Sequence, residues 1–296
     1  MNGPQVPDEW QGGINVTYRL GPGLCHDQTT VVDVKSSLEN KHIHNVVGYI
    51  PGREEEDRYV ILGNHFDAWV YGSIDPNSGT AVLAEVARAM VETMKTTGWR
   101  PARSIVITAW DAEEHGLIGS TEYVEEFVQQ LGSRAVAYVN MDCFDGNFSL
   151  DVDTIPSLRD LAVNVAKLIP NHVEDEVKVG RKTLRHLGTK RQIRQRRSPR
   201  NGHSCGQHGL CSLPYLCSVP VIGFGMVNAT RNLYPLYHSL FETPFVNEHL
   251  YDKPDFATHR SIARYWAELA RALADSPLLP INMTRMAADI SESYLN

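Results

Sequence analysis

Histidine and carboxylate side chains follow several of the apolar runs in this sequence. His65 and Asp67 come shortly after one run, Glu113 and Glu114 after a second, and Asp142 after a third. Histidine nitrogens and carboxylate oxygens are ligands that zinc takes in proteins. In the first cluster, Asp67 could accept the other ring N–H of His65 and fix its tautomer. Because acidic helix starts and surface histidines are common without a metal, each cluster alone is a weak signal.

Two further residues complete a set that a metal-dependent hydrolase would need. Asp75 stands before Pro76 in a loop that leads into a helical pattern, and His238 follows Tyr237 far downstream. Two histidines and three carboxylates can hold two zinc ions if one carboxylate bridges the ions and each ion takes one histidine and one further carboxylate. A water between the ions would attack a carbonyl, and an extra glutamate would accept its proton and pass it to the leaving amine.

Alternating strands and helices are expected to carry these side chains. Apolar and β-branched runs predict strands at 45–50, 59–62, 104–110, 135–141 and 219–224. Apolar residues at helical spacing predict helices at 81–94, 114–130, 156–169 and 256–274. This alternation predicts an α/β fold with a largely parallel sheet, in which functional side chains collect at the carboxyl ends of the strands. The acidic run 54–57 is expected to be a solvated hairpin turn.

The composition is that of an ordinary globular chain. The 296 residues are 42% hydrophobic and 21% charged, which excludes a collagen, a coiled coil and a wholly disordered chain. With 28 basic and 35 acidic residues the net charge is −7, so the overall charge does not favour a nucleic-acid binder. No apolar run reaches the roughly 18 residues of a membrane span, and no signal peptide is visible at the start.

Cysteines and glycosylation sequons bear on the compartment. Five cysteines are too few for a disulfide scaffold, and the spacing of Cys205, Cys211 and Cys217 matches no usual zinc motif. These cysteines are therefore interpreted as structurally neutral. Four Asn-x-Ser/Thr sequons favour a glycosylated, extracytoplasmic protein. Their asparagines are Asn15, Asn147, Asn228 and Asn282.

Four longer motifs make the combination specific. They occupy residues 58–67, 72–76, 110–122 and 234–239. In sequence, order and spacing they resemble the glutamate carboxypeptidase II (N-acetylated-α-linked acidic dipeptidase) family of zinc peptidases, which is related to the transferrin receptor. The resemblance extends over most of the chain. It implies an α/β fold of the zinc-aminopeptidase type, with a mixed, largely parallel sheet flanked by helices and with remnants of an apical domain and of a C-terminal helical domain.

The resemblance also implies a role for each metal-ligand candidate. His65 and Asp142 would bind one zinc ion. Glu114 and His238 would bind the other, and Asp75 would bridge the two.

Further roles follow from the same resemblance. Glu113 would be the general base of a zinc-dependent exopeptidase that hydrolyses peptide bonds, and Tyr237 would donate a hydrogen bond to the developing oxyanion. Glu122 and Glu125 match two ligands of a structural calcium site in the family. The alternative for these two glutamates is a solvated acidic face of a helix.

Other positions depart from the family. The family binds its substrate with arginines, but Asp151 stands where one of them is expected, and Met226 and Asn228 stand near the other two. Without those cations the pocket is not expected to favour a polyacidic, glutamate-rich substrate. The chain resembles the broader peptidase branch of the family more closely.

A basic segment interrupts the resemblance at 178–217. Residues 178–200 contain ten lysines and arginines and no acid. Such a run can be a nucleic-acid patch. The favoured interpretation is a mispredicted piece of the gene, because similarity to the family returns abruptly at residue 219. On that interpretation nucleic acid is not a partner.

The expected organisation is that of an internal piece of a longer protein. Residues 1–40 would end the apical (protease-associated) domain, 41–281 would form the peptidase domain, and 282–296 would begin the dimerisation domain. The full-length protein would be a homodimer outside the plasma membrane, anchored as a type II membrane protein through a segment that is absent here. Two alternatives remain open at this point: a non-catalytic receptor-like homologue, similar to the transferrin receptor, and an inactive fragment.

Overall fold

The chain forms two compact units, Met1–His42 and Ile43–Asn296. The structure, a computed structural model, describes residues 3–12, 14–21, 23, 29–144, 146, 149–172, 193–194, 216–227, 236–252 and 255–295. In the first unit, a 3₁₀ turn, η1 (Asp8–Trp10), lies between Gln5 and Arg19, which form an isolated antiparallel bridge.

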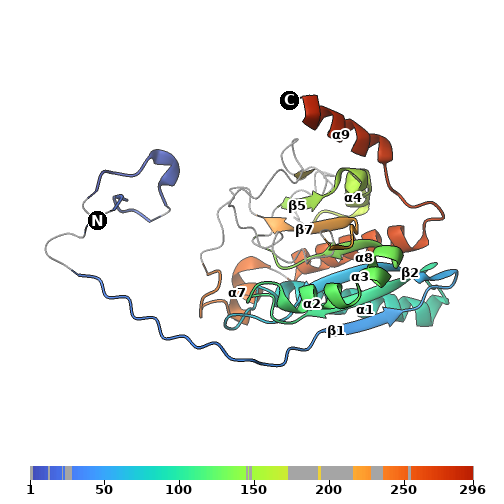
Figure 1. The fold of residues 1–296 in the computed structure, drawn as a ribbon, viewed down its shortest axis with the longest axis horizontal. Helices are drawn as coiled ribbons and strands as arrows, with labels where there is room; N and C mark the ends of the chain where they lie inside the picture. The colour runs from blue at the N-terminus through green and yellow to red at the C-terminus, as the bar shows by residue number, and fades with distance from the viewer. Residues whose placement is uncertain are drawn as a thin grey trace. The chain divides into compact units, whose positions relative to one another are not determined.

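The described residues of the second unit contribute seven strands to one sheet, in the order β1-β3-β2-β4-β7-β5-β6. Figure 1 labels β1, β2, β5 and β7 of this sheet. The strands are β1 (Val46–Ile50), β2 (Glu55–His65), β3 (Arg103–Trp110), β4 (Ala135–Asn140), β5 (Ser149–Thr154), β6 (Ile193–Arg194) and β7 (Val221–Val227). Strands β3, β2, β4 and β7 run parallel to one another, whereas β1 and β5 join antiparallel. The mixed, largely parallel sheet expected from the sequence is therefore confirmed.

Helices cover both faces of this sheet. The helices formed by the described residues are α1 (Asn77–Thr97), α2 (Ile118–Glu126), α3 (Val128–Arg134), η2 (Pro156–Leu158), α4 (Arg159–Leu168), α7 (Pro244–Val246), the π-helical turn η5 (Asn247–Tyr251), α8 (Ala257–Asp275) and α9 (Met283–Leu295). None of the helices formed by the described residues combines the length and the apolar character that a membrane span requires.

Successive side chains along each strand point to opposite faces of the sheet. Along β2, the side chain of Ile61 packs with Val124 of α2 and Leu131 of α3. Its neighbours Val60 and Leu62 point to the opposite face. Helices α1, α4 and α8 pack on that opposite face. The site-bearing strands are thus buried on both sides, as expected for the centre of a parallel sheet.

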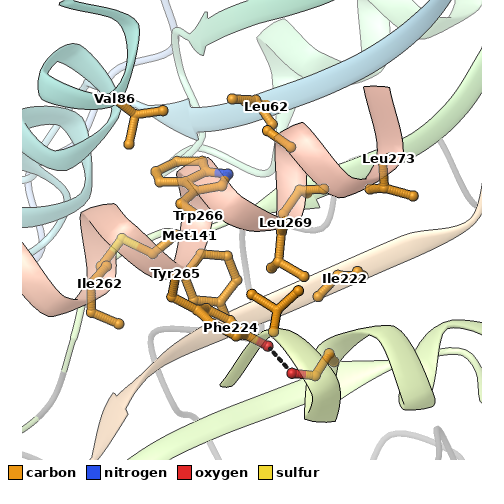
Figure 2. Close-up of a cluster of buried hydrophobic side chains, with 14 of the residues drawn as sticks. Leu62, Val86, Met141, Ile222, Phe224, Ile262, Tyr265, Trp266, Leu269 and Leu273 are labelled. Carbon is orange, nitrogen blue, oxygen red and sulfur yellow. Dashed lines mark hydrogen bonds between the residues drawn. The ribbon is translucent and has the colours of Figure 1, made fainter. Parts of the chain in front are cut away.

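The larger core cluster centres on α8. Figure 2 shows Trp266 and Tyr265 of this helix packed among Leu62 of β2, Val86 of α1 and Phe224 of β7. Phe224 meets Tyr265 edge-to-face, with ring centroids 5.0 Å apart. The Tyr265 hydroxyl donates a 3.1 Å hydrogen bond to a backbone carbonyl of α4, so that α8 is joined to α4 across the cluster.

Three local expectations differ from the structure. The acidic run 54–57 is not a hairpin turn, because β2 already begins at Glu55, which pairs with Arg103 at 2.6 Å. The single helix expected at 114–130 is divided into α2 and α3 at Phe127. Strand β5 is absent from the expected strands, although its alternating Ser-Leu-Asp-Val-Asp pattern is a strand signal.

Candidate metal centre

The ends of three parallel strands bring the candidate ligands to one edge of the sheet. His65 is the last residue of β2, Glu113 and Glu114 follow β3, and Asp142 follows β4. Because β3, β2 and β4 are parallel neighbours, their carboxyl ends meet at this edge. Asp75 reaches the same place from the loop before α1, and its peptide bond to Pro76 is cis.

The first group consists of His65, Asp75 and Asp142, all of them buried. Nε2 of His65 lies 2.8 Å from Oδ1 of Asp142 and 3.2 Å from Oδ1 of Asp75. Only 1% of the His65 side chain is exposed to solvent. A single ring nitrogen therefore faces two carboxylates in a space that is closed to bulk water.

The second group consists of Asp75, Glu114 and His238. Nε2 of His238 lies 3.1 Å from Oδ2 of Asp75 and 3.3 Å from Oε2 of Glu114. Asp75 belongs to both groups and presents a different oxygen to each histidine. The residues of each group are those that the sequence analysis assigned to one zinc ion, with Asp75 in both groups.

The donor atoms of both groups fit zinc. Two ligand atoms bound tetrahedrally at roughly 2.0–2.1 Å from one zinc ion lie about 3.3 Å apart, and the four distances between the histidines and carboxylates are 2.8–3.3 Å. One oxygen each of Asp75 and Glu114 is buried and has no hydrogen-bond donor. A buried carboxylate oxygen without a donor is costly, and a cation in each group would satisfy it.

Asp67 links the first strand end to the second. Its Oδ1 and Oδ2 accept hydrogen bonds from the backbone N–H groups of Glu113 (2.9 Å) and Glu114 (3.2 Å). Nδ1 of His65 lies 3.0 Å from the Asp67 backbone carbonyl and 3.4 Å from Oδ1 of its carboxylate. The ring N–H of His65 therefore points at Asp67, with the backbone carbonyl as the nearer acceptor.

The concentration of acids perturbs the titration of the glutamates. Burial raises the pKa of Glu113 to about 7, and the charges of Asp142 and Asp75 add to this effect while His65 opposes it. Burial and then the charge of Asp75 raise the pKa of Glu114 to about 8. Burial alone would lower the pKa of His65, but the charge of Asp142 and its hydrogen bond raise it by more. In the absence of cations these acids repel one another, which is a further reason why the site suits metal ions.

Tyr237 stands beside the second group. Its ring stacks on the imidazole of His238 at a centroid distance of 3.7 Å. Burial, and then the charge of Asp75, raise the pKa of its hydroxyl. The phenol is thus held neutral next to the candidate ligands.

The first turn of α1 approaches the end of β4 very closely. A Cβ atom at Gly79 would collide with the backbone carbonyls of Asp142 and Met141 and with the side chain of Asn64. Asn64 in turn donates a 3.1 Å hydrogen bond to the Asp142 carbonyl. A residue without a side chain is therefore needed where the Asp75 loop is placed against the strand that carries Asp142.

The remaining sequence candidates lie away from this centre or outside the described residues. Glu122 and Glu125 are exposed on α2. Asn15 is exposed in the first unit, and Asn282 donates a 2.6 Å hydrogen bond to Asp160 while its Oδ1 accepts the N–H of Arg285. Asn147, Asn228 and most of the basic segment 178–217 are outside the described residues; within it, Ile193–Arg194 forms β6.

Two of the positions that depart from the family lie on the neighbouring strands β5 and β7. Asp151 is paired with Gly225, and Met226 is buried. Neither side chain supplies a cation.

Sequence reasoning missed Glu242 and Asn247. Glu242 is 1% exposed and accepts hydrogen bonds from the backbone beside Asp75 and His238. Asn247 donates to the carbonyl and hydroxyl oxygens of Ser73. The only signal for Glu242 is its place four residues after His238, and such a spacing in a loop does not distinguish a buried carboxylate from a solvated one.

Comparisons with known proteins identify relatives of this chain. Residues 45–176 match the family model described as Peptidase family M28. The chain is 54% identical over 300 residues to the "Glutamate carboxypeptidase 2 homolog" of Caenorhabditis briggsae, and 50% identical over 306 residues to that of Caenorhabditis elegans. It is also 35% identical over 302 residues to the "Aminopeptidase NAALADL1" of Rattus norvegicus. The alignments cover 100%, 100% and 96% of this chain but 39% of each relative, so the chain spans about two-fifths of their length.

Solved structures show the same fold at low sequence identity. A zinc aminopeptidase from Bacillus subtilis matches with a TM-score of 0.55 at 18% identity, over 78% of this chain and 50% of that one. An aminopeptidase from Aneurinibacillus sp. strain AM-1 matches with a TM-score of 0.51 at 19% identity, over 80% of this chain and 49% of that one. Residues 45–176 therefore match peptidase family M28, and the chain as a whole is similar to part of the proteins named glutamate carboxypeptidase 2 homolog.

Proposed function

We propose that this chain carries the catalytic centre of a zinc-dependent exopeptidase that binds two zinc ions. The observation that carries the proposal is the position of Asp75 between two groups of ligand atoms, with one oxygen toward His65 and the other toward His238. In this assignment His65 and Asp142 hold one ion, Glu114 and His238 hold the other, and Asp75 bridges them. The match of residues 45–176 to peptidase family M28 and the similarity to glutamate carboxypeptidase 2 homologues support the reaction class.

The residues around the ligands would share the chemical work. When bound, the zinc ions supply Lewis acidity that polarises a peptide carbonyl and makes a water molecule acidic near neutral pH. Glu113, next to the ligand Glu114 and held through its N–H by Asp67, would take the proton from the attacking water and deliver it to the leaving amine. The Tyr237 hydroxyl, kept neutral by burial, would donate a hydrogen bond to the developing oxyanion.

The substrate class we propose is a peptide that is not rich in acidic residues. Five carboxylates already converge on the site, Asp151 stands where the family is expected to supply an arginine, and Met226 stands near the place of another. Relatives of this chain are named both as carboxypeptidases and as an aminopeptidase. An assay must therefore offer peptides with a free amino terminus and peptides with a free carboxyl terminus.

The experiment is a comparison of Glu113→Gln with the wild type in the full-length protein that contains this chain. Peptide hydrolysis and zinc content are measured on the same samples. Loss of a general base costs about 10²- to 10⁴-fold in kcat, whereas the zinc content should stay at two ions per chain because Glu113 is not a ligand. Glu126→Gln, an exposed glutamate of α2, is the matched control and should leave both quantities unchanged.

Two results would contradict the proposal. Equal rates for Glu113→Gln and the wild type would remove Glu113 from the role of base. A wild-type protein that binds no zinc and hydrolyses no peptide would instead favour a receptor-like, non-catalytic member of the family.

The features expected of the full-length protein also remain proposals. They are a type II membrane anchor, a homodimer outside the plasma membrane, glycosylation at the sequons and a calcium ion at Glu122 and Glu125. The sequons support glycosylation, and the sequence resemblance supports the other three features. For calcium, Glu122 and Glu125 lie three residues apart on α2 and therefore share one helix face.

A further inference from the structure

We propose that Glu242 is a positioning residue that holds the loop of Asp75 and the loop of His238 at a fixed separation, and so sets the metal site that these two residues share. The inference rests on the proposed function, because it takes Asp75 and His238 as zinc ligands. The hydrogen bonds that define this role join the Glu242 carboxylate to the backbone of both loops, not to the side chains of Asp75 and His238.

One oxygen of Glu242 holds the loop before α1. Its Oε1 accepts hydrogen bonds from the backbone N–H groups of Ile74 (3.0 Å) and Asp75 (2.5 Å). The main chain of Glu242 adds a third link, since its carbonyl accepts the N–H of Ser73 at 3.2 Å. Three consecutive residues that end at the bridging carboxylate are thus fixed by one glutamate.

The other oxygen of Glu242 holds the second loop. Its Oε2 accepts the backbone N–H of His238 at 3.2 Å. His238 has a φ of 55°, in the left-handed region that a residue with a side chain adopts only at a cost. A conformation of this kind persists where its surroundings impose it, and the bond to Glu242 is one such constraint.

Burial makes these hydrogen bonds difficult to replace. Glu242 is 1% exposed, so water is not available to take over its donors if the carboxylate is lost. Asn247 strengthens the same junction, because its amide donates to the carbonyl and hydroxyl oxygens of Ser73. Residues 238–247 therefore form a brace against the loop 73–75, which lies more than 160 positions earlier in the sequence.

Only a carboxylate of this length can serve both loops. Each of its oxygens is an acceptor, whereas glutamine offers one acceptor oxygen and one donor nitrogen. In Glu242→Gln the amide nitrogen would face a backbone N–H of one loop, and donor against donor is repulsive. Residues that orient metal ligands affect metal affinity by about 10- to 100-fold when they are replaced. We expect that loss chiefly for the ion held by Glu114 and His238.

The test is a zinc titration against a competing chelator, with the wild type and Glu242→Gln of the full-length protein, at a temperature where circular dichroism shows both to be folded. The expected result is two bound ions in the wild type and, in the variant, an affinity about 10- to 100-fold lower for one ion, the one assigned to Glu114 and His238. The affinity for the other ion should change much less. Glu248→Gln, an exposed glutamate six residues further on, should bind zinc as the wild type does.

The outcomes separate this inference from the proposed function. If the wild type binds two ions and Glu242→Gln binds both with unchanged affinity, Glu242 is not a positioning residue, although the two-zinc site stands. If the wild type itself binds no zinc, the proposed function fails first. Should Glu242→Gln not fold, Asn247→Ala tests the same brace from its other side: weaker retention of one ion is expected, and unchanged retention would overturn the inference.

Discussion

Oδ2 of Asp75 lies 3.1 Å from Nε2 of His238, although 163 positions separate the two residues in the sequence. The other oxygen of the same carboxylate lies 3.2 Å from Nε2 of His65. Under the proposed function this carboxylate is shared by two metal ions, so its replacement should lower the metal content more than the replacement of a ligand of one ion.

We expect Asp75→Asn to lose zinc from both groups, because a neutral amide replaces the only carboxylate that the groups share. Glu114→Gln should lose the ion of one group only. Zinc per chain after dialysis against a weak chelator measures the difference, and Asp57→Asn, an exposed acid of β2, is the control. If Asp75→Asn kept as much zinc as Glu114→Gln, the shared position of Asp75 would be wrong.

Gly79→Ala should destabilise the protein by about 1–3 kcal/mol, because its methyl group would collide with backbone at the end of β4. Gly132 in α3 is a matched control, since a Cβ there would meet only the Cys217 carbonyl at 3.7 Å. Gly132→Ala should stabilise by about 0.5–1 kcal/mol, as expected for a glycine in a helix. Urea unfolding of both variants gives the comparison, and equal effects would contradict the close approach.

Tyr138→Phe should cost about 1–3 kcal/mol of the free energy of unfolding. The buried Tyr138 hydroxyl accepts a 3.0 Å hydrogen bond from Nε1 of Trp110 and donates one of 2.8 Å to Oδ1 of Asn140. Phenylalanine would deprive both buried partners of this contact. Thermal or urea unfolding tests the prediction, and the exposed Tyr71→Phe should change stability by no more than about 0.5 kcal/mol.

Asp252→Asn should make stability less dependent on pH in the acid range. Burial would raise the pKa of Asp252, but hydrogen bonds from His259 and from the backbone at the start of α8 lower it by more. Its Oδ1 accepts the N–H of Thr258 (2.8 Å) and its Oδ2 that of His259 (2.9 Å).

A depressed pKa fixes the sign of this effect. The stabilisation by Asp252 is fully present above the pKa of an unfolded aspartate, about 3.9, and is lost as the pH falls through the lower folded value. At pH 6 the free energy of unfolding of the wild type should therefore exceed that of Asp252→Asn by about 1–3 kcal/mol. This difference should become smaller below about pH 4. Urea unfolding at a series of pH values measures it; a gap that widened toward low pH would contradict the assignment.

Much of the fold was predictable because its signals are local. The strand at 104–110 and the helix at 256–274 are continuous or periodic apolar patterns, and β3 and α8 lie there. Local signals failed where a distant partner decides. The acidic run 54–57 resembles a solvated turn, but β2 already begins at Glu55, which pairs with Arg103 of the neighbouring strand β3 in backbone register and as an ion pair.

The sequence by itself determined which residues could bind metal, because His65, Asp75, Glu114, Asp142 and His238 have ligand chemistry and stand at or near the ends of predicted elements. Only the tertiary structure decided how they combine: parallel pairing of β3, β2 and β4 brings three of them together, and the loops of Asp75 and His238 meet across the chain. The role of Glu242 was decided wholly by the tertiary structure. Its role arises from burial and from two loops that are distant in sequence, and neither is encoded in the spacing of neighbouring residues.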